Sequence, residues 1–451
     1  MPLARVAPSR DPQRRRRLLI ALCIYLALTA VFFATAPRDR LVGHTPYNHY
    51  ALMADAWLHG RLDLGGPPPP YTANNDFARH AGKTYVSFPP MPAVLLVPVV
   101  ALAGSVERVR DGQFFLWLAG VGPALLFLGF EKLRRSGRMR HGEATSVALA
   151  VTFALGTVYW FTAVQGTVWY AAHVVGVGLT ALYILFAIDA EHPALAGLAL
   201  GLACATRPSL LFALPWFGYE AWRAAHAQAV LGEPSPVGDP SRLRSAGAAP
   251  VARLLSAGLC FALPLALVGA ALAWHNQARF GSPTEFGHRL LQVAWSKRIA
   301  EWGLFSYHYL GRNLGIVLAG LPFYSPKTGW QINAHGLALW VTTPIYLWAL
   351  WPKRTSRTYW AAAAAAFAVA LPCLLYQNTG WTQFGYRFSN DFAPFLFLMV
   401  LLGKRRLGTT FWLVALLGVA VNAFGALTFE RPGQGHYYYV DGTQKVLVQP
   451  D

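Results

Sequence analysis

Charged residues are scarce in this sequence. Asp, Glu, Lys and Arg make up 13% of its 451 residues, about half the share found in an average soluble domain. Hydrophobic residues make up 55% of the chain, and the mean hydropathy is +0.35. Apolar runs of about 18 residues or more recur along the chain, which is typical of membrane-spanning helices. The composition therefore argues against a soluble protein and predicts an all-α, multi-pass membrane protein.

Acidic residues are scarcer than basic ones, with 20 Asp and Glu against 38 Lys and Arg. A basic surplus can indicate a nucleic-acid partner. Here the basic residues lie in the connections between apolar runs, as they do in cytoplasmic loops, so we expect membrane lipid and no nucleic acid as a partner. These connections are residues 132–140, 220–253, 353–357 and 404–406.

Cysteine is also rare, and none of the four cysteines shows a metal-ligand spacing. They are Cys23, Cys204, Cys260 and Cys373, and all lie in apolar runs. Such cysteines act as small packing residues. The sequence therefore predicts no metal site built on cysteine.

The apolar runs define the expected architecture. Residues 1–17 form a polar N-terminus that ends in four arginines, directly before the first apolar run, 18–36. This basic flank predicts a cytoplasmic N-terminus, so the loop 37–90 should lie outside, in the periplasm of a bacterial cell whose inner membrane holds the protein. At about 20 residues per span, residues 18–427 should hold about eleven to thirteen membrane helices. Residues 428–451 form a polar tail.

One pair of apolar runs conflicts with this topology. If residues 89–104 and 113–130 both crossed the membrane, the basic connection 132–140 would lie outside. Cytoplasmic loops carry the excess of Lys and Arg. Either one of the two runs is short or re-entrant, or the charge rule fails here.

The loop 37–90 is the first long polar segment of the chain. Neighbouring spans are usually connected briefly, so a long loop with carboxylates predicts a site at the membrane surface. Its carboxylates are Asp55, Asp63 and Asp76. Within the loop, residues 47–59 carry apolar side chains at spacings of three and four, which predicts a helix lying in the membrane interface. Asp55 lies off this apolar stripe, with His59 one turn further on.

Five stretches of the chain carry a resemblance to a known family. They are HYALMADAWLHGRLDL, GKTYVSFPPMPAVLL, LALGLACATRPSLLFALP, ARFGSPTEFG and QFGYRFSNDFAPFLFL. Their order along residues 18–427 resembles that of the GT-C membrane glycosyltransferases, in particular bacterial enzymes related to protein O-mannosyltransferases and the aminoarabinose transferase of lipid A. The resemblance implies a GT-C-like helical bundle. It also implies transfer of a sugar from a polyprenyl-phosphate donor to a lipid, glycan or protein acceptor on the outer face.

The resemblance further implies a catalytic carboxylate. A carboxylate within hydrogen-bond reach of an acceptor hydroxyl can take its proton as a general base. Many members carry an Asp-Glu pair just before the helix of the first loop, but Pro46 and Tyr47 stand there in this chain. The base is therefore Asp55, Asp76 or absent. We expect Asp55, because a rigid helix is a better platform than the Asn-rich turn around Asp76.

The same resemblance implies residues that bind the substrates. Arg or Lys would stabilise the leaving phosphate, and His or Tyr would orient a carboxylate or the substrate. The candidates are His49, His59, Lys83, Tyr85, Arg289, Arg312, Lys327 and Arg387. Arg387 has a second interpretation, an ion pair with Asp391. Arg207, at a helix break, is either functional or caps a helix end near the cytoplasmic face.

Two other functions and one cofactor stay open. A transporter or flippase for a lipid-linked saccharide also has many spans, although this chain shows no inverted repeat. A non-catalytic binder of such a lipid would explain the missing Asp-Glu pair. No cofactor is required by the sequence, and a divalent metal is left open, with His44, His49 and Asp55 as ligands on paper.

Overall fold

The computed structural model describes residues 13–231, 240–293 and 295–439. Parts of three expectations lie outside these residues. They concern the N-terminus before residue 13, the linker around residues 232–239 and the polar tail after residue 439.

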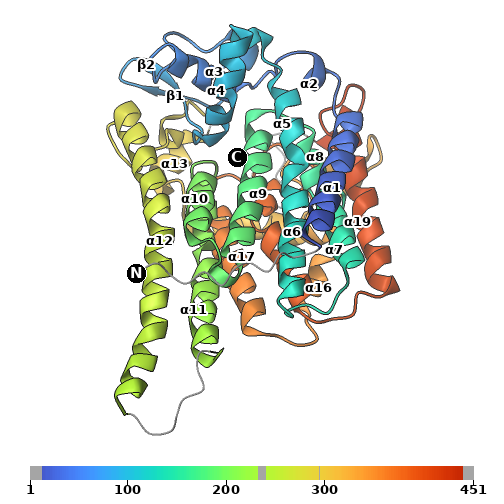
Figure 1. Ribbon diagram of the computed structural model, residues 1–451. Coiled ribbons are helices and arrows are strands. Elements are labelled where there is room, and N and C mark those ends of the chain that lie inside the picture. Colours follow the sequence, from blue (N-terminus) through green and yellow to red (C-terminus); the bar gives the residue numbers. More distant parts are fainter. Residues whose placement is uncertain (1–12, 232–239, 294, 440–451) are drawn as a thin grey trace.

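Helices dominate the described chain, which confirms the all-α class (Figure 1). The longer helices are α1 (Arg14–Thr35), α3 (His49–Leu58), α4 (Met91–Ala103), α5 (Asp111–Ala119), α6 (Val121–Arg135), α7 (Glu143–Leu155), α9 (Val168–Ala187), α10 (Pro193–Cys204), α11 (Leu214–Leu231), α12 (Pro240–Phe280), α14 (Leu310–Ala319), α17 (Arg357–Leu375), α18 (Ala393–Leu402) and α19 (Thr409–Thr428). The short ones are α2 (Asp39–Val42), α8 (Tyr159–Ala163), α13 (Ser296–Trp302), α15 (Leu339–Thr342) and α16 (Tyr346–Leu350).

Five short strands form two small sheets. They are β1 (Phe77–His80), β2 (Lys83–Val86), β3 (Phe323–Ser325), β4 (Gly329–Asn333) and β5 (Tyr438–Tyr439). β1 and β2 pair antiparallel, with Phe77 opposite Val86. In the second sheet β4 is central, antiparallel to β3 and parallel to β5.

Six helical segments of the described chain are long and apolar enough to cross a membrane. They are Arg14–Thr35, Asp111–Arg135, Val168–Ala190, Pro250–Phe280, Arg357–Leu375 and Thr409–Thr428. Four shorter apolar helices, α4, α7, α10 and α18, accompany them. The protein is therefore a multi-pass membrane protein. The number of spans expected from hydropathy, about eleven to thirteen, is larger because some apolar segments form helices too short to cross a membrane. Segment 310–323 forms the ten-residue α14, and segment 336–351 forms α15 and α16.

The connections gather at two opposite ends of the bundle (Figure 1). The loop end carries α2, α3, α4, β1 and β2. The basic end carries residues 132–142, 351–356 and 403–408. There Arg16 at the start of α1 pairs with Glu143 at the start of α7, at 2.5 Å, and the Lys353 amide donates to the Gly403 carbonyl. The basic connections thus share one end, as the charge rule requires.

Helix α4 resolves the conflict between the two apolar runs. Its 13 residues reach only about 20 Å at 1.5 Å per residue, well short of the ~30 Å hydrocarbon core of a membrane. It packs on α3 at the loop end (Figure 1). The next segment, Asp111–Arg135, is long enough to cross. The basic connection after it therefore returns to the end where α1 begins.

The loop end has an apolar core of its own. α3, expected over residues 47–59, forms over His49–Leu58 and buries Tyr50 and Met53 against α4. The same cluster includes Phe115 of α5 and Val168 of α9, so the loop is fixed on the ends of two bundle helices. This packing holds the segment that leads into β1 against the start of α9.

Two helix breaks further along the chain bring polar residues to the same end. α10 ends at Cys204. The carbonyl of its C-cap residue, Ala205, accepts a hydrogen bond from the Met91 amide of α4. Arg207 follows in an extended conformation, before Pro208 starts a 3₁₀ turn. Between α17 and α18 the chain makes a second such turn, Arg387–Asp391. Pro after Arg207 excludes a continuous helix there.

Candidate functional site

Asp76 belongs to the loop, and its carboxylate faces the first turn of α9. Its Oδ2 accepts a hydrogen bond of 2.7 Å from Trp169 Nε1. Its backbone φ is +60°, a left-handed value that is uncommon for residues other than Gly. Asp76 as a residue is only partly buried, yet burial of the carboxyl raises its pKa, while Trp169 and the charge of Arg387 oppose the rise. Strained residues of this kind cluster at functional sites.

His49 supports the turn that carries Asp76. Its Nε2 lies 2.8 Å from the Asn75 carbonyl, and its ring stacks on Phe77 at 4.3 Å. Burial lowers the pKa of His49 to about 4, so the ring is neutral at neutral pH. Nε2 must then carry the proton to donate to the Asn75 carbonyl. His49 therefore positions the residues on both sides of Asp76.

Arg387 is buried close to Asp76. Its Nη1 donates to the carbonyls of Gly380 and Thr382. Its guanidinium lies 5.2 Å from the ring centre of Tyr170 and 5.5 Å from that of Phe388. Within the described chain its buried Nε has no hydrogen-bond partner. A buried donor without an acceptor costs folding free energy, so an anion that accepts from this guanidinium would be stabilised here.

Arg207 is the second cation of the site. Its Nε donates to both carboxylate oxygens of Asp391, at 2.6 and 2.8 Å. The guanidinium lies 5.2 Å from the ring centre of Phe388, which Arg387 also contacts. Among the described residues no partner is recorded for its two terminal nitrogens, and 18% of the side chain remains exposed. The pair with Asp391 thus leaves the outer part of the guanidinium free.

Asp391 anchors this arrangement. Besides Arg207, it accepts hydrogen bonds from Ser209 Oγ at 2.8 Å and lies 3.0 Å from His173 Nδ1. Burial opposes its ionisation, but the charge of Arg207 and the contact with His173 hold the pKa of Asp391 well below its usual range. Asp391 is therefore ionised. The expected pair between Arg387 and Asp391 does not form, because Arg207 occupies the carboxylate instead.

The leading sequence candidate, Asp55, lies apart from this cluster. It sits on the partly exposed face of α3, where its carboxylate is 3.5 Å from Nδ1 of His59. The His59 side chain is 61% exposed. The expected contact between the two residues is present, but it faces away from the apolar core that α3 shares with α4.

The remaining candidates are dispersed over the loop end. Lys83 is exposed and pairs with Asp63 at 3.2 Å. Tyr85 is buried against Phe280 of α12. Arg312 donates to the Gln377 carbonyl. Arg289 and Lys327 are exposed. Of the candidates, the structure therefore brings together Asp76, His49 and Arg387.

The comparisons with known proteins give the fold only distant counterparts. No family model and no curated protein sequence matches the chain. Solved structures similar to it include the oligosaccharyltransferase of Archaeoglobus fulgidus in the apo form, with 12% identity and a TM-score of 0.49. That likeness covers 94% of this chain and 59% of the other, so the chain spans less than two thirds of its counterpart.

A second similar structure is the oligosaccharyltransferase AglB of the same archaeon, in complex with an inhibitory peptide and a dolichol-phosphate. It has 12% identity and a TM-score of 0.45, and the likeness covers 90% of this chain and 56% of the other. Likenesses of this size do not assign an activity.

Sequence reasoning missed several residues of the site. Trp169 was one aromatic residue in an apolar run, and its ring nitrogen could not be placed beside Asp76 without the packing of the loop on α9. His173 likewise lay unmarked inside an expected span. Arg207 could have been assigned with more certainty, since an arginine at a helix break within apolar sequence is functional by default. Its place is at the loop end and not at the cytoplasmic cap that was the other interpretation.

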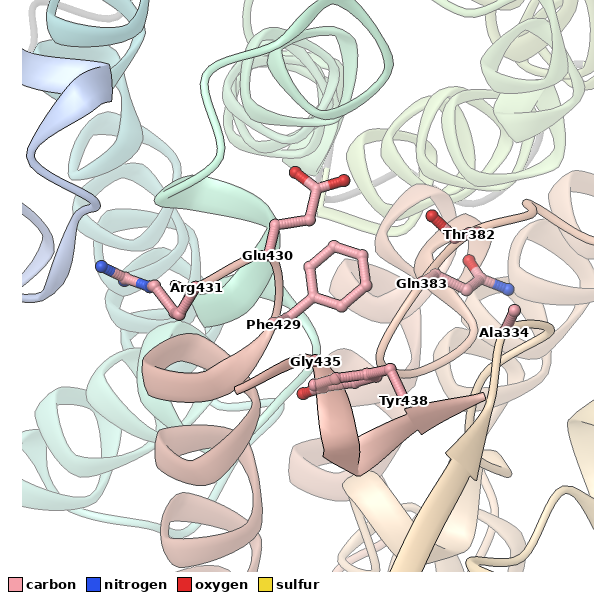
Figure 2. Close-up of a pocket in the computed structure, with 8 residues that line it drawn as sticks. All are labelled: Ala334, Thr382, Gln383, Phe429, Glu430, Arg431, Gly435 and Tyr438. Carbon is pink, nitrogen blue, oxygen red and sulfur yellow. The ribbon is translucent and has the colours of Figure 1, made fainter. Parts of the chain in front are cut away.

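A cavity of about 180 Å³ lies beside the site, where α19 ends (Figure 2). It is lined by Ala334, Thr382, Gln383, Phe429, Glu430, Arg431, Gly435 and Tyr438. Its lining residue Thr382 accepts hydrogen bonds through its carbonyl from Arg387 Nη1 and Tyr170 Oη. The cavity and the arginine site therefore share a wall. Within the described chain no three His, Cys, Asp or Glu residues gather as metal ligands.

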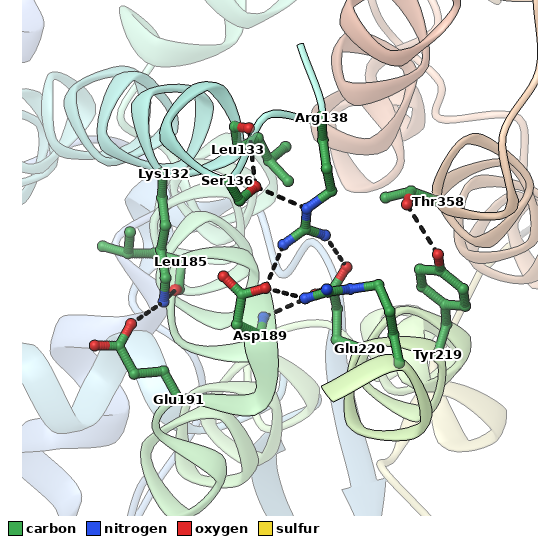
Figure 3. Close-up of polar contacts among 11 residues, drawn as sticks. Lys132, Leu133, Ser136, Arg138, Leu185, Asp189, Glu191, Tyr219, Glu220 and Thr358 are labelled. Atoms are coloured by element: carbon green, nitrogen blue, oxygen red, sulfur yellow. Dashed lines mark hydrogen bonds and ion pairs between the residues drawn. The ribbon is translucent and has the colours of Figure 1, made fainter. Parts of the chain in front are cut away.

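The basic end holds a second cluster of charges, at the opposite end of the bundle (Figure 3). Arg138 donates to the fully buried Glu220 at 2.5 Å and to Asp189 at 2.7 Å. Arg223 also contacts both carboxylates, and the Asp189 amide donates to Glu220. These bonds tie the connection after α6 to the α9–α10 turn and to α11. Every carboxylate of this cluster faces a cation.

Proposed function

We propose that this protein is a GT-C-type membrane glycosyltransferase that moves a sugar from a polyprenyl-phosphate donor to an acceptor hydroxyl at the loop end. One observation carries the proposal: a strained carboxylate, Asp76, and two guanidiniums, Arg207 and Arg387, gather where the loop closes over the bundle. Such a site offers a base and an anion clamp at the level where a lipid headgroup would lie.

In this scheme the phosphate of the donor binds between Arg387 and the free nitrogens of Arg207. Phosphate is well matched to guanidinium donors. Both guanidiniums also lie near the Phe388 ring, at 5.2 and 5.5 Å from its centre. The polyprenyl chain would extend into the lipid beside the apolar helices. This placement leaves the sugar on the side of Asp76.

Asp76 then acts as the general base. As the acceptor oxygen forms its bond to the anomeric carbon, its proton passes to the carboxylate. The bond between the anomeric carbon and the phosphate oxygen breaks, and the phosphate leaves with the electron pair. Its new negative charge is stabilised by the two guanidiniums. Trp169 holds one carboxylate oxygen, which leaves the other for the proton.

Asp76 is favoured over Asp55 for this role. Asp55 contacts only an exposed histidine, whereas Asp76 lies near a buried cation and has a raised pKa. A base with a pKa nearer the working pH transfers protons more effectively. The loop end would face the periplasm of a bacterial cell, because the basic end has the charge of cytoplasmic loops.

The test measures release of polyprenyl phosphate by the purified full-length protein in liposomes. Undecaprenyl-phosphate glucose, mannose and arabinose serve as donors, with a total membrane lipid extract as the source of acceptor. Asp76→Asn should lower turnover by about 10²–10⁴-fold at equal folded amounts. Asp55→Asn, the matched control on the same loop, should leave turnover near normal.

Two results would overturn the scheme. Loss of turnover in Asp55→Asn with Asp76→Asn active would place the base on α3. No turnover by the unaltered protein with any donor, together with movement of the donor lipid between leaflets, would establish the transport alternative. Donor binding with neither turnover nor movement would establish a non-catalytic binder.

A further inference from the structure

We propose that the cavity at the end of α19 is a subsite for a single hydroxylated sugar ring, with Glu430 as the residue that binds its hydroxyls. The proposal rests on the proposed function, because it places a sugar beside the arginine site. Figure 2 shows Glu430, Phe429, Gln383 and Tyr438 around this cavity.

The backbone presents Glu430 to the cavity. α19 ends at Thr428, and Glu430 follows with a left-handed φ of +52°. The Tyr438 hydroxyl lies 2.7 Å from Thr428 Oγ1, and β5 pairs with β4, so the returning chain closes the other side. Like Asp76, Glu430 has a left-handed backbone conformation. Both carboxylates are near enough to Arg387 to act on its charge.

One oxygen of Glu430 is available to a ligand. Its Oε2 accepts from Arg40 Nη2 at 3.1 Å, and among the described residues no partner is recorded for Oε1. The side chain is 37% exposed. The pair with Arg40 holds the carboxylate in position. A hydroxyl group that donates to Oε1 would form a charge-assisted hydrogen bond, which is stronger than a neutral one.

The size and lining of the cavity select the ligand. A volume of about 180 Å³ is below the range of roughly 300–1,000 Å³ for drug-sized ligands, so it would admit one ring and not an oligosaccharide. Phe429 and Tyr438 provide aromatic surface, with ring centres 5.3 Å apart. The C–H face of a sugar ring packs on such surface while its edge carries hydroxyls.

Two other ligands fit less well. A second phosphate would be repelled by the Glu430 carboxylate at the cavity. An isoprenoid unit would cover that carboxylate with apolar atoms and leave its free oxygen without a partner, which is costly for a buried charged acceptor. A neutral, hydroxylated ring satisfies both the carboxylate and the aromatic lining.

The sugar could belong to the donor or to the acceptor, since both present hydroxylated rings. The cavity shares Thr382 with the arginine site, which is compatible with either source. Measurements of KM separate them, because only one substrate's KM should rise when the cavity is altered.

Two variants probe the cavity. Glu430→Gln removes the charge but keeps the shape. Gly435→Val adds a side chain where a Cβ would meet nothing within 4 Å, so it fills open space without a clash. Gly408→Val is the matched control, because its Cβ also meets nothing within 4 Å but lies at the basic end, before α19.

The first measurement is saturation-transfer NMR of methyl glycosides of glucose, mannose, galactose and arabinose with the full-length protein in detergent. At least one glycoside should bind, Glu430→Gln and Gly435→Val should each weaken it by about 10-fold or more, and Gly408→Val should not. No binding by the unaltered protein, or equal binding in all variants, would overturn the subsite.

The second measurement repeats the turnover assay. A raised acceptor KM assigns the cavity to the acceptor sugar, and a raised donor KM assigns it to the donor sugar. Unchanged KM values for both substrates would overturn its role in transfer. If the unaltered protein shows no turnover, the proposed function fails, while the NMR result decides the binding site on its own.

Discussion

The two ends of the bundle treat buried charge in opposite ways. At the basic end, Arg138 and Arg223 each form ion pairs with both Asp189 and Glu220. At the loop end, Arg387 is held by backbone carbonyls and aromatic faces, and its Nε has no partner within the described chain. Both clusters contain a guanidinium whose buried Nε has no hydrogen-bond partner within the described chain, that of Arg223 at the basic end and that of Arg387 at the loop end. Of these two arginines, only Arg387 has no carboxylate recorded in an ion pair with it among the described residues.

This difference separates charges that tie helices together from the charge that we propose binds the donor phosphate. Ion pairs between arginines and carboxylates of different helices fix those helices relative to one another. A buried guanidinium with an unused donor costs folding free energy until a ligand supplies an acceptor. Burial and an unused donor alone therefore do not distinguish the two clusters, whereas the lack of an ion-paired carboxylate distinguishes Arg387 from Arg223 within the described chain.

The largest expected effect concerns which end faces the outside. Arg79→Cys and Thr284→Cys place a thiol on exposed positions of the loop end, and Thr355→Cys places one at the basic end. In a background without the four native cysteines, an impermeant thiol reagent on intact cells should label the first two and not the third. Labelling of Thr355→Cys alone would invert the topology and reject the outer-face site.

Breaking the ion-pair network of the basic end should cause the next largest effect. Glu220→Ala leaves Arg138 without its buried partner, and removal of one partner from a buried pair typically costs about 3–5 kcal/mol. Thermal unfolding in detergent should show a clear loss of stability. Glu191→Ala is the control, because the Glu191 side chain is 56% exposed in its pair with Lys132 and should cost at most about 1 kcal/mol. Equal losses of stability in Glu220→Ala and Glu191→Ala would contradict a structural role of the Glu220 ion pairs.

Removing Arg387, the buried cation of the loop end, should affect ligand binding more than folding. Arg387→Ala should weaken binding of a polyprenyl-phosphate sugar by about 10–100-fold, and Arg387→Lys by less, since Lys keeps the charge but loses the planar fork. Arg289→Ala, an exposed cation of the same end, should change nothing. Equilibrium binding of a fluorescent donor analogue measures these affinities. Unchanged binding in both Arg387 variants would make Arg387 structural.

The smallest expected effect is a shift in the pH profile. Burial raises the pKa of Asp76, and the Trp169 hydrogen bond counteracts the rise. The base works only when ionised, so turnover should fall as the pH drops through this raised pKa. Trp169→Phe removes the hydrogen bond, so the acid limb of kcat should move to higher pH. A shift to lower pH, or no shift, would show that Asp76 is not the titrating base.

The same group has the opposite effect on stability. Because the folded pKa of Asp76 lies above its unfolded value, the folded state binds the proton more tightly. Its contribution to the free energy of unfolding therefore rises as the pH falls through the folded pKa. Asp76→Asn should abolish this dependence and leave stability at neutral pH unchanged or slightly higher.

Local patterns in the sequence predicted part of this molecule. The spacing of Tyr50, Met53 and Trp57 predicted the helix α3, because a 3.6-residue repeat indicates one buried face. The basic connections predicted a shared end. The charge conflict around residues 132–140 left two explanations open, a short or re-entrant run or a failure of the charge rule, and the 13-residue α4 favours the first.

The pairing of residues from distant segments could not be predicted in this way. Asp391 could have bound Arg387, four residues away, or Arg207, and hydropathy is the same in both cases. The choice depends on where the break after α10 places Arg207 relative to α17 and α18. Asp76 ranked below Asp55 for the same reason, since its neighbour Trp169 approaches only through tertiary packing.

The short length of α4 also bears on how the chain is inserted during synthesis. In the proposed topology, the translocation machinery meets a run of apolar residues soon after the first span, yet it must let that run pass through with the polar loop around it. Pro98 inside α4 and the limited length of the run weaken its tendency to stop in the lipid. Residues 36–110 would then cross as one continuous segment. A few added leucines in α4 could trap it in the bilayer and reverse the orientation of every later helix.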